Sequence, residues 1–335
     1  MASLAGTNFT IYLDYIQVQM NRYLSPTIFI FGVIGNTLNC IVLGQPTLRS
    51  NPCALLFLVS SFVDLISILV GLPTRILAGW NLDPTAAITW ICRFRAFVVF
   101  TTRTIAAWLI MFATVDRWLL SSVDIHRRQL SSIKNIRTQI LVTFVLSIAV
   151  YAHMLYCYEA NLNDQPLQCY GKSEQCRFAT DMIYALVTIV IPLIGMMTFG
   201  LMTIVNVRRA QRRAHPDLRA TSDVNHHSRR VNNQLLRMLF VQVLFLIVLC
   251  VPQAIQKFYS TVRPFGAGST DEDAVKTLLY NIELLLAFIA SGMPFYIYTL
   301  FGETIFRKEF IHVIEKIRKK RMGMVRTIDR THCRT

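Results

Sequence analysis

The sequence predicts an all-α membrane protein, folded as a bundle of seven transmembrane helices. Hydrophobic residues make up 53% of the 335 residues and charged residues only 16%, whereas soluble domains carry about 25% charged residues. The apolar residues also gather in continuous blocks, and a helix needs about 20 mostly apolar residues to cross a bilayer. These continuous runs do not alternate with polar residues, which argues against a transmembrane β-barrel.

Seven apolar blocks define the expected spans. In chain order they cover residues 24–43, 53–72, 90–120, 136–156, 182–207, 235–258 and 274–300. Asp64 and Glu283 dilute the second and seventh blocks. The third and fifth are longer than a bilayer is thick, so we expect tilt or extension into the cytoplasm. The expected organisation is an extracellular N-terminus over residues 1–23, a bundle over 24–300 and an interfacial helix with a basic tail over 301–335.

Basic residues predict the orientation of the bundle. Lys and Arg concentrate after the third, fifth and seventh blocks. Cytoplasmic loops carry such an excess, so we expect the N-terminus outside and the C-terminus in the cytoplasm of a plasma-membrane protein. The formal charge of +15 is then a property of the inner face, beside anionic lipid, and does not indicate nucleic-acid binding.

Two further features extend this topology. Residues 303–321 carry apolar side chains at helical spacing against a basic face, which predicts a short amphipathic interfacial helix after the seventh span. Asn8-Phe9-Thr10 is a glycosylation sequon in the expected extracellular segment, so Asn8 is a candidate glycosylation site.

Four cysteines fall at the expected outer face, where disulfides persist. They are Cys92, Cys157, Cys169 and Cys176. Four cysteines allow three pairings, and their spacing alone does not select one.

The third block carries the most informative motif. Cys92 begins it and Asp116-Arg117-Trp118 closes it 24 residues later, about 36 Å along a helix and therefore one bilayer with its margins. Further short motifs follow one another along the chain. They are Gly35-Asn36, Leu58-Val59-Ser60-Ser61-Phe62-Val63-Asp64-Leu65, Pro73, Pro192 and Pro252. With these motifs the sequence resembles the rhodopsin-like (class A) G-protein-coupled receptors over nearly its whole length.

The resemblance implies roles for these residues. Asp116, Arg117 and Trp118, with Tyr298 in the seventh span, form the expected G-protein-coupling switch. Cys92 is expected to form a disulfide with the loop between helices four and five. Cys169 is the preferred partner, and Cys176 is then left to pair with Cys157.

Inside the membrane, the expected switch residues are Asn36, Asp64, Pro192 and Pro252. An intramembrane acid is costly without polar partners, so Asp64 is a functional candidate and Asn36 its expected neighbour. The prolines leave backbone carbonyls unpaired and bend their helices, either for movement or as tolerated kinks.

The sequence also departs from the family pattern. Trp118 replaces a tyrosine, and Cys250 replaces the tryptophan at the pocket floor. Helix seven reads Met293-Pro294-Phe295-Tyr296-Ile297-Tyr298 in place of Asn-Pro-x-x-Tyr. Tyr298 is the preferred match to the tyrosine, and alignment of the prolines would put Ile297 there. Ala106 and the missing asparagine remove usual partners of Asp64, which argues against bound sodium. No metal or cofactor is expected.

Ligand class follows from the outer half of the bundle. Val99 replaces the aspartate of amine receptors, and no lysine lies midway along helix seven, as an opsin needs. Leu130-Ser131-Ser132 and Tyr298-Thr299-Leu300 resemble receptors for FMRFamide-type neuropeptides. The candidate ligand pocket comprises Arg75, Val99, Arg103, Gln253, Gln256, Lys257 and Glu283. This net basic set favours a ligand with an acidic group. Internal pairing of these side chains, above all of Arg103 with Glu283, is an equal alternative.

The expected function is that of a receptor for an extracellular ligand, a neuropeptide or another small ligand, that activates a heterotrimeric G protein. A seven-span transporter or a non-peptide chemosensory receptor is the alternative, although the sequence lacks the internal repeats expected of a transporter. A membrane enzyme would need paired acids or histidine clusters in the spans, and His153 is the only histidine there.

Overall fold

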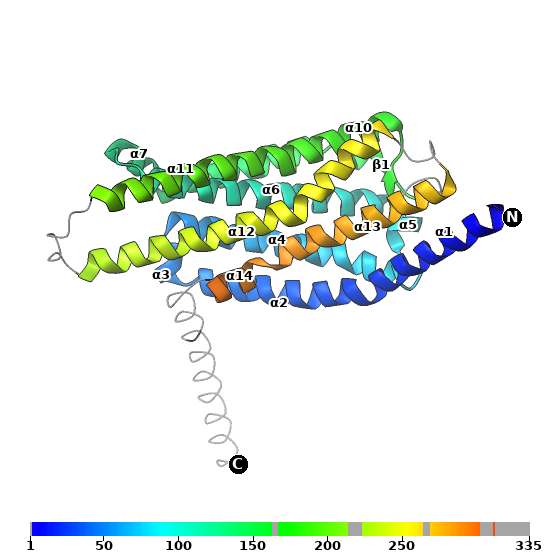
Figure 1. The fold of residues 1–335 in the computed structure, drawn as a ribbon, viewed down its shortest axis with the longest axis horizontal. Helices are drawn as coiled ribbons and strands as arrows, with labels where there is room; N and C mark the ends of the chain where they lie inside the picture. The colour runs from blue at the N-terminus through cyan, green and yellow to red at the C-terminus, as the bar shows by residue number, and fades with distance from the viewer. Residues whose placement is uncertain (1, 163–166, 214–222, 264–268, 302–310, 312–335) are drawn as a thin grey trace, which may run out of the picture.

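The computed structural model describes residues 2–162, 167–213, 223–263, 269–301 and 311. Within this part of the chain, seven helices are long and apolar enough to cross a membrane. They lie side by side along the long axis of the molecule (Figure 1). The predicted seven-helix bundle is therefore confirmed. The expected interfacial helix over 303–321 lies outside the described residues, apart from Ile311.

Each span consists of one to three helical elements. In chain order they are α1 (Ala2–Gln19), η1 (Met20–Leu24) and α2 (Ser25–Leu43); α4 (Pro52–Ala78); α6 (Thr89–Ser121); α8 (Ile133–Tyr151) and α9 (Met154–Cys157); α10 (Glu174–Ile183), η2 (Tyr184–Val190) and α11 (Ile191–Arg213); α12 (Asp223–Val262); and α13 (Thr270–Gly292) and α14 (Pro294–Phe301). The short connecting helices are α3 (Pro46–Arg49), α5 (Pro84–Ala87) and α7 (Ile125–Leu130).

The centre of the bundle is α6, which packs against α4, α8 and α11 and is the most buried of the seven spans. The faces turned away from α6 remain apolar. On α8, for example, Leu141, Val145 and Leu146 are exposed. A contiguous apolar surface of this kind suits lipid and not water.

The first helix differs from its expected length, because the helical chain begins near Ala2 and not near residue 24. Packing explains the extension. Leu13 is buried, and the α1 residue Gln17 accepts a hydrogen bond from Asn281 Nδ2 of α13 at 2.8 Å. Farther along, Gly32 and Gly292 let α2 and α13 approach closely, since a Cβ on Gly292 would lie 3.2 Å from Gly32 Cα.

The fifth span contains a π-helical segment, η2, directly before Pro192. In an i to i−5 pattern the N–H of residue 192 would donate to the carbonyl of Val187, but proline has no N–H. Trp108 Nε1 of α6 donates to that carbonyl at 2.9 Å instead. The local widening at Pro192 is thus held by a side chain of the central helix.

One end of the bundle carries two disulfides, Cys92–Cys169 and Cys157–Cys176. We call it the disulfide end, and the opposite end the Arg117 end. A small hairpin at the disulfide end pairs β1 (Tyr158–Glu159) with β2 (Tyr170–Gly171) antiparallel, with Tyr158 opposite Gly171. Both preferred cysteine pairings are present in the structure.

Candidate functional site

At the Arg117 end, a buried ion pair closes the central helix. Arg117 Nη2 lies 2.6 Å from Asp116 Oδ2, and the two side chains are 3% and 1% exposed. Arg117 also donates to Asn51 Oδ1 at 3.2 Å, and Ser131 donates to the other oxygen of Asp116. Asn51 caps the start of α4. The pair therefore connects α6 to the adjacent ends of α4 and α7.

Tyr298 lies in the interior near this end and is fully buried. Its ring packs 5.1 Å from the ring of Phe57, and its hydroxyl donates to Gln242 Oε1 of α12 at 2.6 Å. This bond joins α14 to α12, and Gln242 is not among the residues expected from the sequence. Trp118 faces elsewhere: its ring packs against Phe199 at 5.2 Å.

Near the middle of the bundle, Asp64 lines a small cavity of about 70 Å³ with Ser60 and Ser291. Such a space holds a few water molecules. Asn36 was expected to be the partner of Asp64. Its amide donates instead to the carbonyls of Gly32 and Ser291, both at 3.0 Å, and so ties α2 to α13.

Arg103 lines the same cavity and does not pair with Glu283 as expected. Its guanidinium carbon lies 4.1 Å from the ring centre of Phe288, and Nη2 is 3.5 Å from the carbonyl oxygen of Leu284. No ion pair joins Arg103 to Glu283 among the described residues. Successive residues of a helix point about 100° apart, so the surface near Leu284 and Phe288 does not bring the carboxylate of Glu283 to Arg103.

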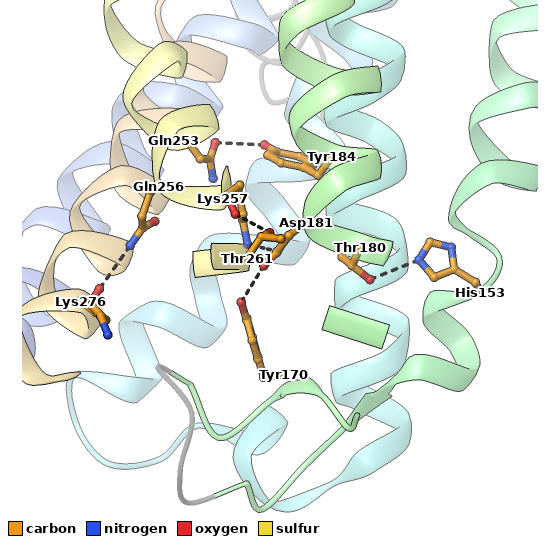
Figure 2. Close-up of polar contacts among 10 residues, drawn as sticks. All are labelled: His153, Tyr170, Thr180, Asp181, Tyr184, Gln253, Gln256, Lys257, Thr261 and Lys276. Carbon is orange, nitrogen blue, oxygen red and sulfur yellow. Dashed lines mark hydrogen bonds and ion pairs between the residues drawn. The ribbon is translucent and has the colours of Figure 1, made fainter. Parts of the chain in front are cut away.

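At the disulfide end, Lys257 forms a buried ion pair with Asp181 (Figure 2). The distance from Nζ to Oδ1 is 2.6 Å, and the side chains are 2% and 7% exposed. Tyr170 OH donates to the second carboxylate oxygen at 3.5 Å, and Lys257 Nζ lies 4.8 Å from the ring centre of Tyr280. We call Lys257, Asp181, Tyr170 and Tyr280 the Lys257 cluster.

Two glutamines of α12 extend this polar region. Gln253 accepts a hydrogen bond from Tyr184 OH at 3.1 Å, and Gln256 donates to the carbonyl of Lys276 at 3.2 Å (Figure 2). Gln253, Gln256 and Lys257 thus join the sixth span to the fifth and the seventh. Glu283 is buried, and its Oε2 has no hydrogen-bond partner among the described residues.

Asp181 and Tyr170 are not among the site residues expected from the sequence. Asp181 precedes the expected fifth block by one residue, so the apolar pattern leaves it outside the bundle. Tyr170 follows the disulfide cysteine Cys169, and the hairpin carries it inward. Burial raises the pKa of Tyr170 well above its usual range. Its hydroxyl therefore stays protonated and able to donate to Asp181.

The remaining candidates lie apart from the Lys257 cluster. Val99 is buried against Ile68 and Phe288 in an apolar cluster. Arg75 Nη1 donates to Asn281 Oδ1 at 3.3 Å, toward α1. Asn8 is exposed on α1, and its glycosylation stays a prediction. The described residues contain no group of three or more metal-ligating side chains that could hold an ion.

Comparison with known protein families gives one match. Residues 35–298 match the family described as 7 transmembrane receptor (rhodopsin family). A search of curated proteins found no match. The matched region begins in α2 and ends at Tyr298, so it contains the bundle from the first span to the seventh.

Proposed function

Because this chain belongs to the rhodopsin family of seven-transmembrane receptors, we propose that it binds an extracellular ligand at its disulfide end and activates a heterotrimeric G protein at its Arg117 end. Receptors of this family are not enzymes. The observation that carries the proposal is the buried Asp116–Arg117 pair at one end, opposite a buried polar cluster at the other. A signal must connect these two ends.

The proposed orientation places the disulfide end outside the cell. Disulfides persist in oxidising compartments, and two of them stabilise this end. Lys and Arg concentrate in the segments at the opposite end, as is typical of cytoplasmic loops. The N-terminus is then extracellular and the C-terminus cytoplasmic, at the plasma membrane.

The proposed mechanism separates α12 from the rest of the bundle at the Arg117 end. In the resting state Asp116, Asn51 and Ser131 hold this end closed around Arg117. Ligand binding moves α12 outward, and the guanidinium of Arg117 becomes available to the G protein. Arginine suits this role because it stays charged at any physiological pH.

The ligand we propose is a neuropeptide, on the resemblance to FMRFamide-type receptors. In this proposal the buried polar side chains of Gln253, Gln256 and Lys257 exchange hydrogen bonds within the protein for hydrogen bonds to peptide groups. An acidic ligand group would compete with Asp181 for Lys257, which gives the ligand a direct way to loosen the contact between α10 and α12.

The experiment is a screen of a neuropeptide library in cells that report calcium and cyclic nucleotides. We expect at least one peptide to activate the wild type. Arg117→Ala should reach the cell surface and lose most of this signal, because the residue that contacts the G protein is gone.

Arg49→Ala is the matched control, since Arg49 is an exposed arginine in α3 near Asn51. It should signal normally. Full signalling by Arg117→Ala at matched surface expression would refute the proposed coupling role. Activation by none of the peptides in the library would refute the ligand class.

A further inference from the structure

Two buried arginines line a polar cavity at the disulfide end, apart from the Lys257 cluster. The cavity has a volume of about 390 Å³ and lies among α1, α4, α6, α13 and the chain leading into β2. Arg75 of α4 is 4% exposed and Arg95 of α6 is 9% exposed. Gln17, Asp83, Gln168 and Asn281 also line it.

Both guanidinium groups keep unused donors. A guanidinium carries five N–H donors. Arg75 donates to Asn281 Oδ1 at 3.3 Å, and Arg95 Nη2 donates to the carbonyl of Gly71 at 3.2 Å. The Nε of each arginine is buried with no hydrogen-bond partner among the described residues. Each arginine therefore keeps donors that the described residues do not use, and both residues line the cavity.

No carboxylate of the described residues lies within ion-pair distance of Arg75 or Arg95. Asp83 lines the same cavity, but its Oδ1 accepts from Thr85 N at 2.9 Å and from Thr85 Oγ1 at 2.7 Å. Burying charge without pairing is costly, and two like charges in one cavity add to that cost. An anion in the cavity would relieve both.

We infer that this cavity binds a carboxylate group. Arginine donates two parallel hydrogen bonds to a carboxylate, which gives both energy and orientation. Under the proposed function, the carboxylate belongs to the receptor's ligand, either as part of a peptide or as a small organic acid. A peptide amide carries no charge, so an amidated neuropeptide would have to place an acidic side chain here.

The test uses the purified full-length receptor in lipid nanodiscs. The thermal unfolding midpoint is measured against rising 3-phenylpropionate, with uncharged 3-phenylpropanamide as the control probe. Because a molecule that binds only the folded state stabilises it, the acid should raise the midpoint and the amide should not. Arg75→Gln and Arg95→Gln should each need at least about tenfold more acid for the same shift.

Arg263→Gln is the matched control, because Arg263 is an exposed arginine at the same end and does not line the cavity. It should keep the full shift. Ala86→Leu leaves both arginines in place but fills the cavity, so it should also lose the shift and serves if a Gln variant fails to fold. A carboxylate of the protein itself would compete with the added acid. Asp164 is close in sequence to the cavity residue Leu167 and lies outside the described residues, so the titration is repeated with Asp164→Asn.

An equal shift in the wild type, both Gln variants and Ala86→Leu would overturn the site. So would the absence of a shift in both the wild type and Asp164→Asn. A peptide with a free carboxylate that acts at lower concentration than 3-phenylpropionate would assign the site to a peptide, and equal potency to an organic acid. The measurement needs no G protein, so a normal shift without signalling would refute the proposed function alone.

Discussion

Lys257 forms an internal ion pair, which is one of the two alternatives that the sequence leaves open for it. The sequence predicts it as a pocket residue or as a member of an internal pair, and the structure shows an internal pair with Asp181. Removing one member of a buried pair leaves the other charge unpaired, which costs about 3–5 kcal/mol. Replacing both with apolar residues is often neutral.

We therefore expect Lys257→Met and Asp181→Leu each to lower the thermal midpoint, and the double variant to recover most of the loss. The exposed pair of Arg263 and Glu272 is the control, at 3.8 Å and 64% and 34% exposed. Arg263→Met should change stability by less than about 1 kcal/mol. A double variant less stable than both single variants would contradict the paired arrangement.

At the residue scale, the sequence predicts the charge and polarity of a buried side chain better than it predicts the residues which that side chain contacts. Arg117 and Asp116 are adjacent, so their pairing follows from the motif itself. Arg103 could be recognised as a buried cation, but its neighbours depend on helix rotation. The structure places it over Phe288 and beside the cavity of Asp64, not against Glu283. A rotation of one residue about the helix axis decides between these outcomes, and hydropathy does not encode it.

At the element scale, the fifth span combines a predictable feature with an unpredictable one. Pro192 indicates an irregular helix, and the structure contains η2 directly before it. The compensating donor, Trp108, comes from α6, and no local pattern around Pro192 indicates it.

We expect Trp108→Phe to keep the ring but lose the hydrogen bond to Val187. An unsatisfied carbonyl inside the membrane costs about 1–3 kcal/mol, so the thermal midpoint should fall. Trp90→Phe is the control, because Trp90 is 68% exposed. Equal midpoints for the two variants would show that the indole N–H does not support η2.

At the scale of the whole molecule, hydropathy predicts the seven spans because each is a continuous apolar run. Hydropathy underestimates how far a helix extends beyond its apolar run. The sixth block was expected at 235–258, whereas α12 runs from Asp223 to Val262. Polar residues such as Arg and Gln are good helix formers outside lipid, so a helix can continue where its apolar pattern ends. The residues at which α12 begins and ends could therefore not be predicted from its apolar pattern.

The same helix connects the two proposed sites. Lys257 and Gln242 both lie on α12, 15 residues and about 22 Å apart. Pro252 lies between them, where it removes one backbone hydrogen bond and weakens the helix. Under the proposed mechanism, a ligand that displaces Asp181 from Lys257 at one end would pivot α12 and break the contact between Gln242 and Tyr298 at the other.

This coupling predicts an effect on basal activity for one of two neighbouring tyrosines and none for the other. Tyr298 OH donates to Gln242 of α12, while Tyr296 OH donates to the carbonyl of Phe31 in α2 at 2.9 Å. If the first bond holds the resting bundle closed, Tyr298→Phe should raise basal G-protein activity, since about 1 kcal/mol shifts a two-state equilibrium roughly fivefold. Gln242→Leu should raise it similarly, and the double variant should add little more, because both changes remove one bond. Tyr296→Phe leaves α12 untouched and should keep basal activity low.

If Tyr298 acts instead by holding the open form, Tyr298→Phe would lower the maximal agonist response without raising basal activity. Basal and agonist-stimulated signalling at matched surface expression distinguishes these results.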